Sequence, residues 1–459
     1  MQKVSIAMNI NLTAEDFSKN YKTNKKMNSL LYIKLRSIYH RVHSFLYHYY
    51  QYHLLFKWIQ YKQKHLLVKI QKKDKVSVVF FAMNLPMWRY QSLYEALSKH
   101  PYFDTHIVLS PCISFSREQQ KKDIELLRTF FNKKSIKYID FNLEDSTCYD
   151  VKGKLKPDIL FYTQPSFFIL RKEHDSHSFT DKLLCYYPYA FWTALSDWSY
   201  DKPFHNIAWK LYYSTELHRK DAIHFAHNKG KNVVVVGYPN ADNFLFSPPI
   251  DVWKPQKKKK KRLIWAPHFT IIKERSLVSH SNFLWMADFM LNIAQKYAED
   301  IQIAFKPHPR LLTELYLHPE WGKEKANAYY DTWKNLGNGQ LDDGEFKDLF
   351  MTSDGMIHDS GSFTVEYHYS LKPVMYVIKD KKVYADTLSD FGKLALDAHY
   401  FGQNETDIIS FIENIILNSN DDMYPIRKKF YDDYLLPPDG KSVTENTLED
   451  LLKSLKTNE

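Results

Sequence analysis

The sequence predicts an α/β protein with two doubly wound, Rossmann-like domains that follow a basic helical N-terminal arm. Its 459 residues suit two or three domains. Short continuous apolar runs alternate with helical stretches, which is typical of parallel sheets covered by helices on both faces. The content of 44% hydrophobic and 25% charged residues is that of a globular protein and excludes global disorder.

The positive charge is concentrated at the N-terminus. The chain has 63 Lys and Arg against 53 Asp and Glu, a formal net charge of +10. Residues 1–75 contain 15 basic and three acidic side chains, so their net charge is +12 and that of the remaining 384 residues is −2. This asymmetry indicates an anionic partner for the arm, rather than a body that binds nucleic acid.

The arm, residues 1–75, has the pattern of an amphipathic helix. No Pro or Gly occurs between Met27 and Ile70. Apolar residues recur there at steps of three and four, at Leu31, Leu35, Ile38, Val42, Phe45 and Tyr49. No segment resembles a transmembrane span or a signal peptide. We expect the arm to lie on an anionic membrane surface, with packing on the globular body as the alternative and no nucleic acid partner.

The first domain is predicted over residues 76–247. Its expected elements are strands at 76–83, 105–109, 158–162 and 233–237, and helices near 92–99 and 117–132. Residues 248–262 (PPIDVWKPQKKKKKR) follow, with three prolines and six consecutive cations. Because such a segment cannot bury itself, we expect it to be an exposed linker between the domains.

The second domain is predicted over residues 263–459. Its expected strands are 263–266, 301–305, 355–358 and 374–378, and its expected helices are 283–297, 362–371, 407–417 and 447–455. Open parallel sheets bind ligands at the carboxyl ends of their strands. We therefore expect the functional site in a cleft between the two domains, at those strand ends.

Two loops of the second domain carry histidines directly after strands. His268 follows Pro267 at the end of strand 263–266. His308 lies in the segment Lys306-Pro307-His308-Pro309-Arg310 after strand 301–305. Because the prolines restrict the backbone, His308 is held between two cations, where it could carry a proton or donate to a phosphoryl oxygen. A surface or structural histidine is the alternative.

A third loop has the composition of a phosphate site. Asp359-Ser360-Gly361-Ser362 precedes the helix expected at 362–371. Unpaired backbone N–H groups and the positive end of a helix dipole together favour an anion. Glu366 lies one turn further on, where its carboxylate could accept hydrogen bonds from a ribose. Capping of the helix by Asp359 or Ser360 is the structural alternative.

Other common site motifs are missing from the sequence. There is no GxxxxGK[ST] phosphate loop and no HExxH zinc motif. The three cysteines, Cys112, Cys148 and Cys185, form no CxxC pair and suit a reducing cytosol. The acidic run at 342–345 lacks the ligand periodicity of a calcium loop. We therefore expect neither a metal nor a cofactor.

The three loops, in this order, resemble the CDP-glycerol glycerophosphotransferase family, which builds teichoic acids and related capsular polymers. The resemblance covers residues 232–379. Ala266-Pro267-His268-Phe269 matches the family's Ala-Pro-Thr-Phe segment, and Pro307-His308-Pro309 matches its Leu-His-Pro element. Asp359, Ser362 and Glu366 match its Asp-Tyr-Ser-Ser segment and the acid that follows. Gly237-Tyr238-Pro239 with Asp242 matches its Gly-Tyr-Pro-Arg-x-Asp segment, with Asn240 in place of Arg.

The resemblance implies a GT-B fold and a phosphotransferase. The enzyme would move glycerol phosphate, or a similar phosphoalditol, from a CDP-activated donor to a hydroxyl of a polymer or lipid-linked acceptor, releasing CMP. It would be cytoplasmic and peripheral on the inner face of the cell membrane. Two alternatives remain open: a GT-B glycosyltransferase or epimerase that uses a nucleotide sugar, and a non-catalytic membrane scaffold.

The expected site residues follow from the loops and the resemblance together. His308 and His268 are the expected catalytic residues. The expected nucleotide- and phosphate-binding residues are Lys306, Arg310, Asp359, Ser360, Gly361, Ser362 and Glu366. The family also has a Trp-His-Gly-Thr-Pro segment whose histidine is its expected base, but the corresponding residues 185–192 (CYYPYAFW) contain no histidine. His268, where the family has Thr, is the candidate replacement.

Overall fold

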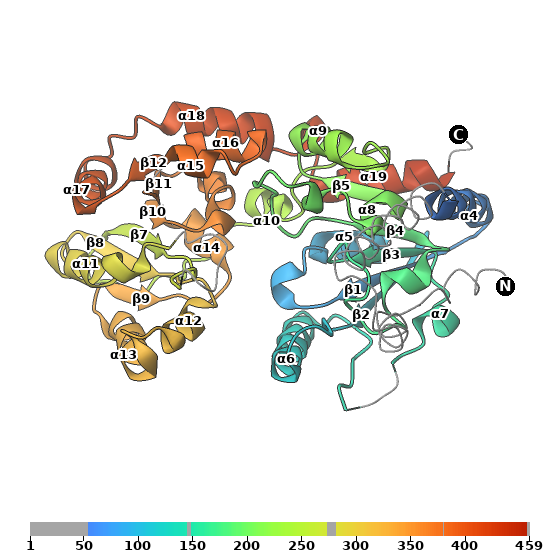
Figure 1. Cartoon of the computed structure of the whole chain (residues 1–459), viewed down its shortest axis with the longest axis horizontal. Coiled ribbons are helices and arrows are strands. Elements are labelled where there is room, and N and C mark those ends of the chain that lie inside the picture. The colour runs from blue at the N-terminus through green and yellow to red at the C-terminus, as the bar shows by residue number, and fades with distance from the viewer. Residues whose placement is uncertain (1–53, 145–147, 273–280, 380, 457–459) are drawn as a thin grey trace, which may run out of the picture. The chain divides into compact units, whose positions relative to one another are not determined.

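The computed structural model describes residues 54–144, 148–272, 281–379 and 381–456, and it confirms the α/β class (Figure 1). The chain divides into two compact units, Met1–Trp58 and Ile59–Glu459. Both sheets belong to the second unit. The apolar stripe predicted between Leu31 and Tyr49 lies outside the described residues.

The first sheet is six-stranded and parallel in the described residues, with the order β2-β1-β3-β4-β5-β6. Its strands are β1 (Val76–Ala82), β2 (Phe103–Leu109), β3 (Ile159–Tyr162), β4 (Leu183–Tyr186), β5 (Lys210–Tyr213) and β6 (Val233–Val235). The chain places β2 on one side of β1 and returns with β3 on the other. The crevice between β1 and β3 is therefore a topological switch point.

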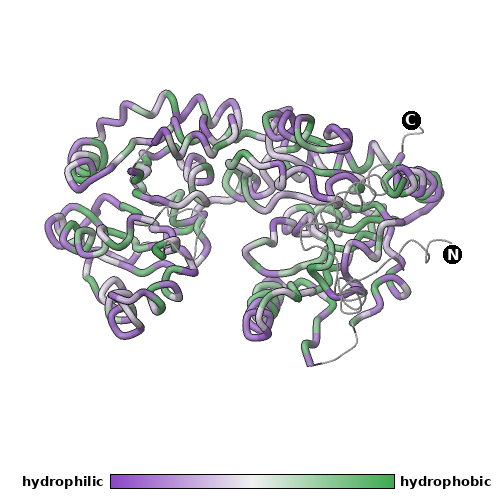
Figure 2. The backbone as a smooth tube through the Cα atoms, viewed as in Figure 1, coloured by the Kyte–Doolittle hydropathy of each residue, from purple (hydrophilic) through white to green (hydrophobic). Residues whose placement is uncertain are grey.

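The second sheet is also six-stranded and parallel in the described residues, but its order is β12-β11-β10-β7-β8-β9, with two strands instead of one on the outer side of its first strand. Its strands are β7 (Lys261–Ala266), β8 (Ile301–Phe305), β9 (Gly339–Leu341), β10 (Gly355–His358), β11 (Val374–Val377) and β12 (Tyr400–Gly402). Here the switch point lies between β7 and β10. The strands are mostly hydrophobic, whereas hydrophilic stretches recur along the helices (Figure 2).

An α-helix lies between most consecutive strands, as is usual for parallel sheets, whereas β3–β4 and β10–β11 are connected through 3-10 segments. The α-helices of the first half of the chain lie before, between or directly after the strands of the first sheet. They are α4 (Phe56–Ile70), α5 (Gln91–Lys99), α6 (Arg117–Lys133), α7 (Val151–Lys154), α8 (Pro203–Ile207), α9 (Glu216–Phe225) and α10 (Ala241–Phe246). Those of the second half are α11 (Phe283–Lys296), α12 (Leu311–Leu317), α13 (Gly322–Asn335), α14 (Phe346–Met351), α15 (Lys381–Ala385), α16 (Asp390–Asp397), α17 (Glu405–Ser410), α18 (Tyr424–Phe430) and α19 (Val443–Lys456).

One predicted helix is wrong, and it is the helix on which the phosphate site was expected. In place of a helix over 362–371, the chain forms two short 3-10 segments, Gly361–Phe363 and Glu366–Ser370. Thr364 and Val365, which separate them, are both β-branched and disfavour a continuous helix. Leu371 then adopts φ 56° and ends the second segment.

The other differences between the predicted and the observed elements are smaller. Four short strands, β4, β5, β9 and β12, were not predicted. The predicted helix 407–417 is α17 followed by a π-helical turn, Phe411–Leu417. The segment 248–262 is exposed over most of its length, but Trp253 is buried and Lys261 and Arg262 already belong to β7. Trp253 is anchored because its indole donates to the Thr352 hydroxyl at 3.1 Å.

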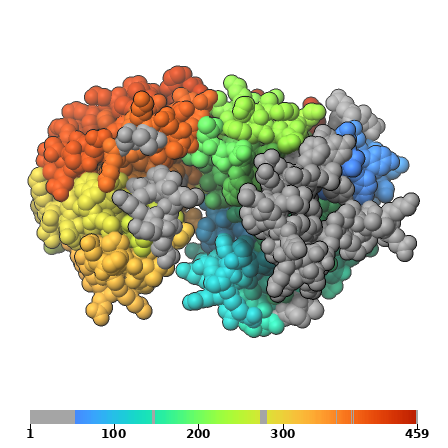
Figure 3. Space-filling model, in the orientation of Figure 1, coloured from blue at the N-terminus to red at the C-terminus, as the bar shows by residue number. Residues whose placement is uncertain are grey.

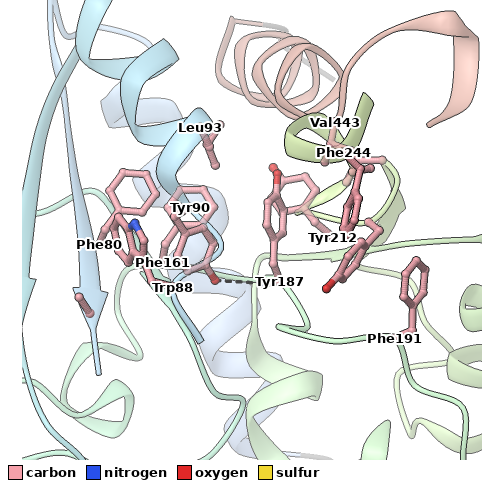
Figure 4. Packing of buried hydrophobic residues seen from close by; sticks show 14 of the residues in the cluster. Phe80, Trp88, Tyr90, Leu93, Phe161, Tyr187, Phe191, Tyr212, Phe244 and Val443 are labelled. Carbon is pink, nitrogen blue, oxygen red and sulfur yellow. Dashed lines mark hydrogen bonds between the residues drawn. The ribbon is translucent and has the colours of Figure 1, made fainter. Parts of the chain in front are cut away.

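An aromatic core packs behind the first switch point (Figure 4). Phe80 of β1 stacks on Phe161 of β3, with ring centroids 4.7 Å apart. Tyr90 is buried, and its hydroxyl donates to the Tyr162 carbonyl and accepts from the Tyr187 amide at 3.1 Å. This single phenol therefore ties the loop after β1 to the ends of β3 and β4.

The C-terminal helix α19 packs against the first half of the chain, beside α5 and α10. Asp242 accepts hydrogen bonds from the Val443 and Thr444 amides at 2.7 and 2.9 Å, which caps α19. Gly237 has φ +103°, and a Cβ there would lie 2.9 Å from Val443. These contacts give a structural reason for Gly and Asp in the Gly-Tyr-Pro segment. The domain boundaries themselves stay a prediction.

A short bridge joins the two halves within the second unit. Ala194 pairs with Leu388 as an isolated antiparallel bridge. The Leu195 amide donates to the Thr387 carbonyl at 3.0 Å, and the Ser389 amide donates to the Thr193 carbonyl at 2.9 Å. Figure 3 shows the green residues around α9 in contact with the orange-red second half.

Candidate functional site

Three predicted site loops come together at the carboxyl edge of the second sheet. β10, β7 and β8 are neighbours in that sheet, so the loops after His358, Ala266 and Phe305 leave it side by side. The first two loops flank the switch point. The strand order therefore assembles what the sequence could give only as three separate segments.

His268 and His308 lie against each other, with ring centroids 5.1 Å apart. Phe269 packs on both rings, with centroids 4.3 Å from His268 and 4.5 Å from His308. The His308 amide donates to the Pro267 carbonyl at 3.0 Å, which fixes one loop on the other. The Nδ1 of His268 is 3.0 Å from the Thr270 hydroxyl.

His308 is arranged as a neutral hydrogen-bond donor. Its Nδ1 accepts the Arg310 amide at 3.1 Å. Burial, followed by the nearby Arg310 charge, lowers the pKa of His308 to about 4. At neutral pH the ring is therefore uncharged and its proton is on Nε2. Such a group can donate to a phosphoryl oxygen, whereas the geometry does not favour it as a general base.

Asp359 is a buried clamp between loops. Its carboxylate accepts the His268 amide at 2.6 Å and also accepts the Asn282 amide at the start of α11. Burial raises the pKa of Asp359 to about 6, although both hydrogen bonds act in the opposite direction. Because its carboxylate oxygens accept these two amides, Asp359 holds the His268 loop in place and does not itself contact an anion.

The two cations beside His308 are paired with carboxylates. Lys306 is buried, and its Nζ lies 2.6 Å from Asp342 and 2.7 Å from the Gly344 carbonyl. Arg310 lies 3.2 Å from Glu314, and its guanidinium is 4.1 Å from the Phe269 ring centroid. Lys306 therefore fixes the loop after β9, and Arg310, which is largely exposed, is the one of the two that a ligand could reach.

The Ser360–Ser362 segment forms a tight turn. The Ser360 carbonyl accepts the Phe363 amide at 3.3 Å and the Thr364 hydroxyl at 3.4 Å. Gly361 and Ser362 lie in the 3-10 segment Gly361–Phe363. Because no α-helix begins here, the predicted dipole contribution to phosphate binding is absent. The Ser360 amide also has a partner already, His358 Nδ1 at 3.3 Å.

Glu366 is buried and faces the first half of the chain. The Tyr238 hydroxyl donates to its carboxylate at 3.2 Å. Burial raises the pKa of Glu366 to about 7, opposed in part by the Arg89 charge. Tyr238 belongs to the Gly-Tyr-Pro segment, so this hydrogen bond joins two segments that the sequence could not show to be in contact.

Behind the Ser360 turn lies a cluster of three buried histidines. The Nε2 atoms of His358 and His399 are 3.2 Å apart, and the His368 and His399 rings are 4.7 Å apart. Burial lowers the pKa of His358 and of His368 to about 3, so both are neutral. The cluster could not be predicted from the sequence, because His358, His368 and His399 have no regular spacing there.

The segment at 185–192 has no histidine of its own, but His218 of α9 packs against it. The Nε2 of His218 lies 3.1 Å from the Trp192 carbonyl, and its Nδ1 lies 2.7 Å from the Thr215 hydroxyl. Its ring is 4.5 Å from Phe391 of the second half. Since both nitrogens are engaged and the residue is buried, His218 supports this loop and is not placed as a base.

Two further cavities do not involve the predicted site. Their volumes are about 360 Å³, beside α4 and β6, and about 390 Å³, between β6 and α19. No predicted site residue lines either one. Among the described residues no group of histidine, cysteine and acidic side chains could hold a metal ion.

Two doubly wound domains with their loops at the carboxyl strand ends define a GT-B-like α/β protein. The chain belongs to the CDP-glycerol:poly(glycerophosphate) glycerophosphotransferase family, because that family's model matches residues 201–451, more than half of its length. It is therefore a CDP-glycerol glycerophosphotransferase-like enzyme.

Solved structures agree on the fold. The wall teichoic acid polymerase TagF superimposes with a TM-score of 0.54 at 12% identity, covering 86% of this chain and 93% of that one. A UDP-GlcNAc 2-epimerase from Neisseria meningitidis gives 0.51 at 16% identity, covering 83% and 100%. Another UDP-N-acetylglucosamine 2-epimerase gives 0.52 at 14% identity, covering 84% and 98%. No protein of curated function matches the sequence.

Among the described residues, no helix is both long and apolar enough to cross a bilayer.

Proposed function

We propose that this chain transfers a glycerol phosphate or similar phosphoalditol group from a CDP-activated donor to a polymer hydroxyl and releases CMP. The observation that carries the proposal is the contact between His268 and His308 at the second switch point, beside the clamped Asp359 loop. A neutral imidazole donor and nearby main-chain amides suit a diphosphate.

The proposed roles follow from the contacts of each residue. The Nε2–H of His308 donates to a phosphate oxygen, Arg310 adds charge, and the amides of Gly361 and Ser362 add donors. Lys306 and Asp359 keep the loops in position. Glu366 accepts a ribose hydroxyl after Tyr238 has released it. His268 takes the proton of the acceptor hydroxyl.

The proposed reaction is an in-line displacement at the phosphorus that carries the alditol. The acceptor oxygen forms a bond to that phosphorus, while the bond between the phosphorus and the bridging oxygen breaks and CMP leaves with the electron pair. The proton passes from the acceptor hydroxyl to His268. Most of the catalysis then comes from positioning and from neutralising charge on the phosphoryl oxygens.

The test is release of nucleotide from CDP-glycerol, CDP-ribitol and UDP-N-acetylglucosamine by the full chain and its variants. We expect CMP from a CDP-alditol and a loss on the order of 10²–10³ in kcat for His308→Ala. His318→Ala is the matched control, because its Nδ1 likewise accepts an amide two residues on, from Glu320 at 3.3 Å, away from the site. UDP release alone would favour a glycosyltransferase or epimerase, and no turnover would favour a scaffold.

We also propose peripheral association with an anionic membrane surface through residues 1–75, at the inner face of the cell membrane. Support comes from their net charge of +12 and their apolar periodicity. Cosedimentation with phosphatidylglycerol vesicles should exceed that with phosphatidylcholine vesicles. Replacing Lys25, Lys26 and Arg36 with Glu should reduce it, and equal binding to both vesicle types would refute the proposal.

A further inference from the structure

A cation that the sequence did not single out faces the site from the first half of the chain. Arg89 lies in the loop after β1, at the first switch point, where open parallel sheets bind ligands. Its neighbours Trp88 and Tyr90 are both buried in the aromatic core (Figure 4). Because the Tyr90 hydroxyl bonds to two other segments, the backbone at Arg89 is held on a rigid support.

The Arg89 side chain reaches the place where the two halves meet. Its Nε donates to the Tyr189 carbonyl at 3.2 Å, and its Nη1 donates to the Trp88 carbonyl at 3.4 Å. It interacts with the Tyr238 hydroxyl and with the Glu366 carboxyl. Tyr238 itself donates to Glu366, so Arg89 lies beside the same group that we assign to the ribose.

The charge of Arg89 is compensated differently from that of the two predicted cations. Lys306 pairs with Asp342 and Arg310 pairs with Glu314. In the part of the chain that the structure describes, Arg89 forms no ion pair within 4.0 Å, and its hydrogen bonds to the main chain go to neutral carbonyl oxygens. Burial raises the pKa of Glu366, the acid that Arg89 interacts with, to about 7, so this carboxyl is only partly ionised near neutral pH.

We propose that Arg89 binds a phosphate group of the substrate from the first half of the chain. The inference rests on the proposed function and deepens it by adding a binding residue. A planar guanidinium matches two phosphate oxygens at once and stays charged at any pH of interest. That phosphate belongs either to the donor diphosphate or to the acceptor polymer, and the two sources differ in the kinetic constant that changes.

The experiment compares wild type, Arg89→Gln, Arg89→Lys and the control Arg117→Gln. Arg117 is an exposed arginine of the same half that pairs with Glu144 at 2.5 Å. We expect Arg89→Gln to raise KM about 10- to 100-fold for one substrate, the range for a lost hydrogen bond to a charged group. A rise with CDP-glycerol assigns the donor, and a rise with a glycerol phosphate oligomer assigns the acceptor.

A purely structural role predicts a different pattern. If Arg89 only braces the Tyr189 carbonyl, Arg89→Gln and Arg89→Lys should lower the melting temperature while leaving both KM values within twofold of wild type, which would overturn the inference. A phosphate-binding role instead leaves Arg89→Lys between wild type and Arg89→Gln in KM, and makes the wild-type KM more sensitive to salt.

Failure of the proposed function can be distinguished from failure of this inference. If wild type releases no CMP from any CDP-alditol, the proposed function is wrong. Titration calorimetry with CDP-glycerol and with the glycerol phosphate oligomer then decides on Arg89. Weaker binding of either ligand by Arg89→Gln supports the inference, and equal affinity for both, or no binding to wild type, refutes it.

Discussion

Replacing Glu366 with Gln tests the buried carboxyl at the meeting of the two halves. The pKa of Glu366 rises from an ordinary 4.5 to about 7 because the group is buried. Between these values the unfolded chain loses the proton while the folded protein keeps it. The free energy of unfolding therefore falls as the pH rises from 4.5 to 7, and the penalty is constant above that. Gln keeps an oxygen acceptor for Tyr238 and does not titrate.

The size of the effect follows from the shift. About 2.5 pKa units at about 1.4 kcal/mol each amount to a penalty on the order of 3 kcal/mol for wild type at pH 8. Glu366→Gln should therefore gain thermal and urea stability over wild type as the pH rises from 5 to 8. Comparison with wild type cancels the titration of Asp359, which both proteins share.

The assay is a melting curve and a urea midpoint at half-unit pH steps. Glu345→Gln, which replaces an exposed carboxyl in the same half, should follow wild type. Curves for Glu366→Gln and wild type that stay parallel from pH 5 to 8 would refute the reasoning. They would mean that Glu366 is ionised in the folded protein at low pH, in spite of its burial.

Three further predictions address the loops of the second half. Lys306→Met should destabilise the fold by about 3–5 kcal/mol in urea unfolding, because it leaves Asp342 unpaired, and the double variant with Asp342→Leu should recover most of that loss; no recovery would show that the ion pair is not the cause. Asp359→Asn offers one oxygen acceptor for two amides, so we expect a loss of about 1–3 kcal/mol and a lower kcat as the His268 loop shifts; unchanged melting and kcat would contradict the clamp. Since the pKa of His308 is about 4, His308→Gln should lower kcat evenly from pH 6 to 9, and a change in the shape of the pH profile would contradict a neutral donor.

The sequence predicted most of the buried strands and the loops that follow them. Continuous apolar runs identified β1, β7, β8, β10 and β11 with errors of a few residues, because buried parallel strands need apolar side chains on both faces. The order of the histidine and Asp-Ser-Gly loops pointed to the carboxyl edge of the second sheet. These features are local, and each is written in a few consecutive residues.

The helix expected to bind the phosphate, residues 362–371, was not predicted correctly. Residues 362–371 were expected to form one helix, but the β-branched Thr364 and Val365 separate two 3-10 segments, and the positive φ of Leu371 ends the second. The strands β4 and β5 were missed, although they are no shorter than β10 and β11, which were predicted. Short segments of this kind are decided by what packs on them.

By itself, the sequence determined the fold class, the strand-end position of the loops and the concentration of positive charge in the arm. Only the tertiary structure decided which polar groups are committed to one another. It pairs Lys306 with Asp342, places Asp359 on the amides of another loop, and sets Arg89 and Tyr238 beside Glu366. These partners lie from tens of residues to more than a hundred and fifty residues apart in the chain. Because strand order brings them together, no local pattern could reveal which cation is left for a phosphate.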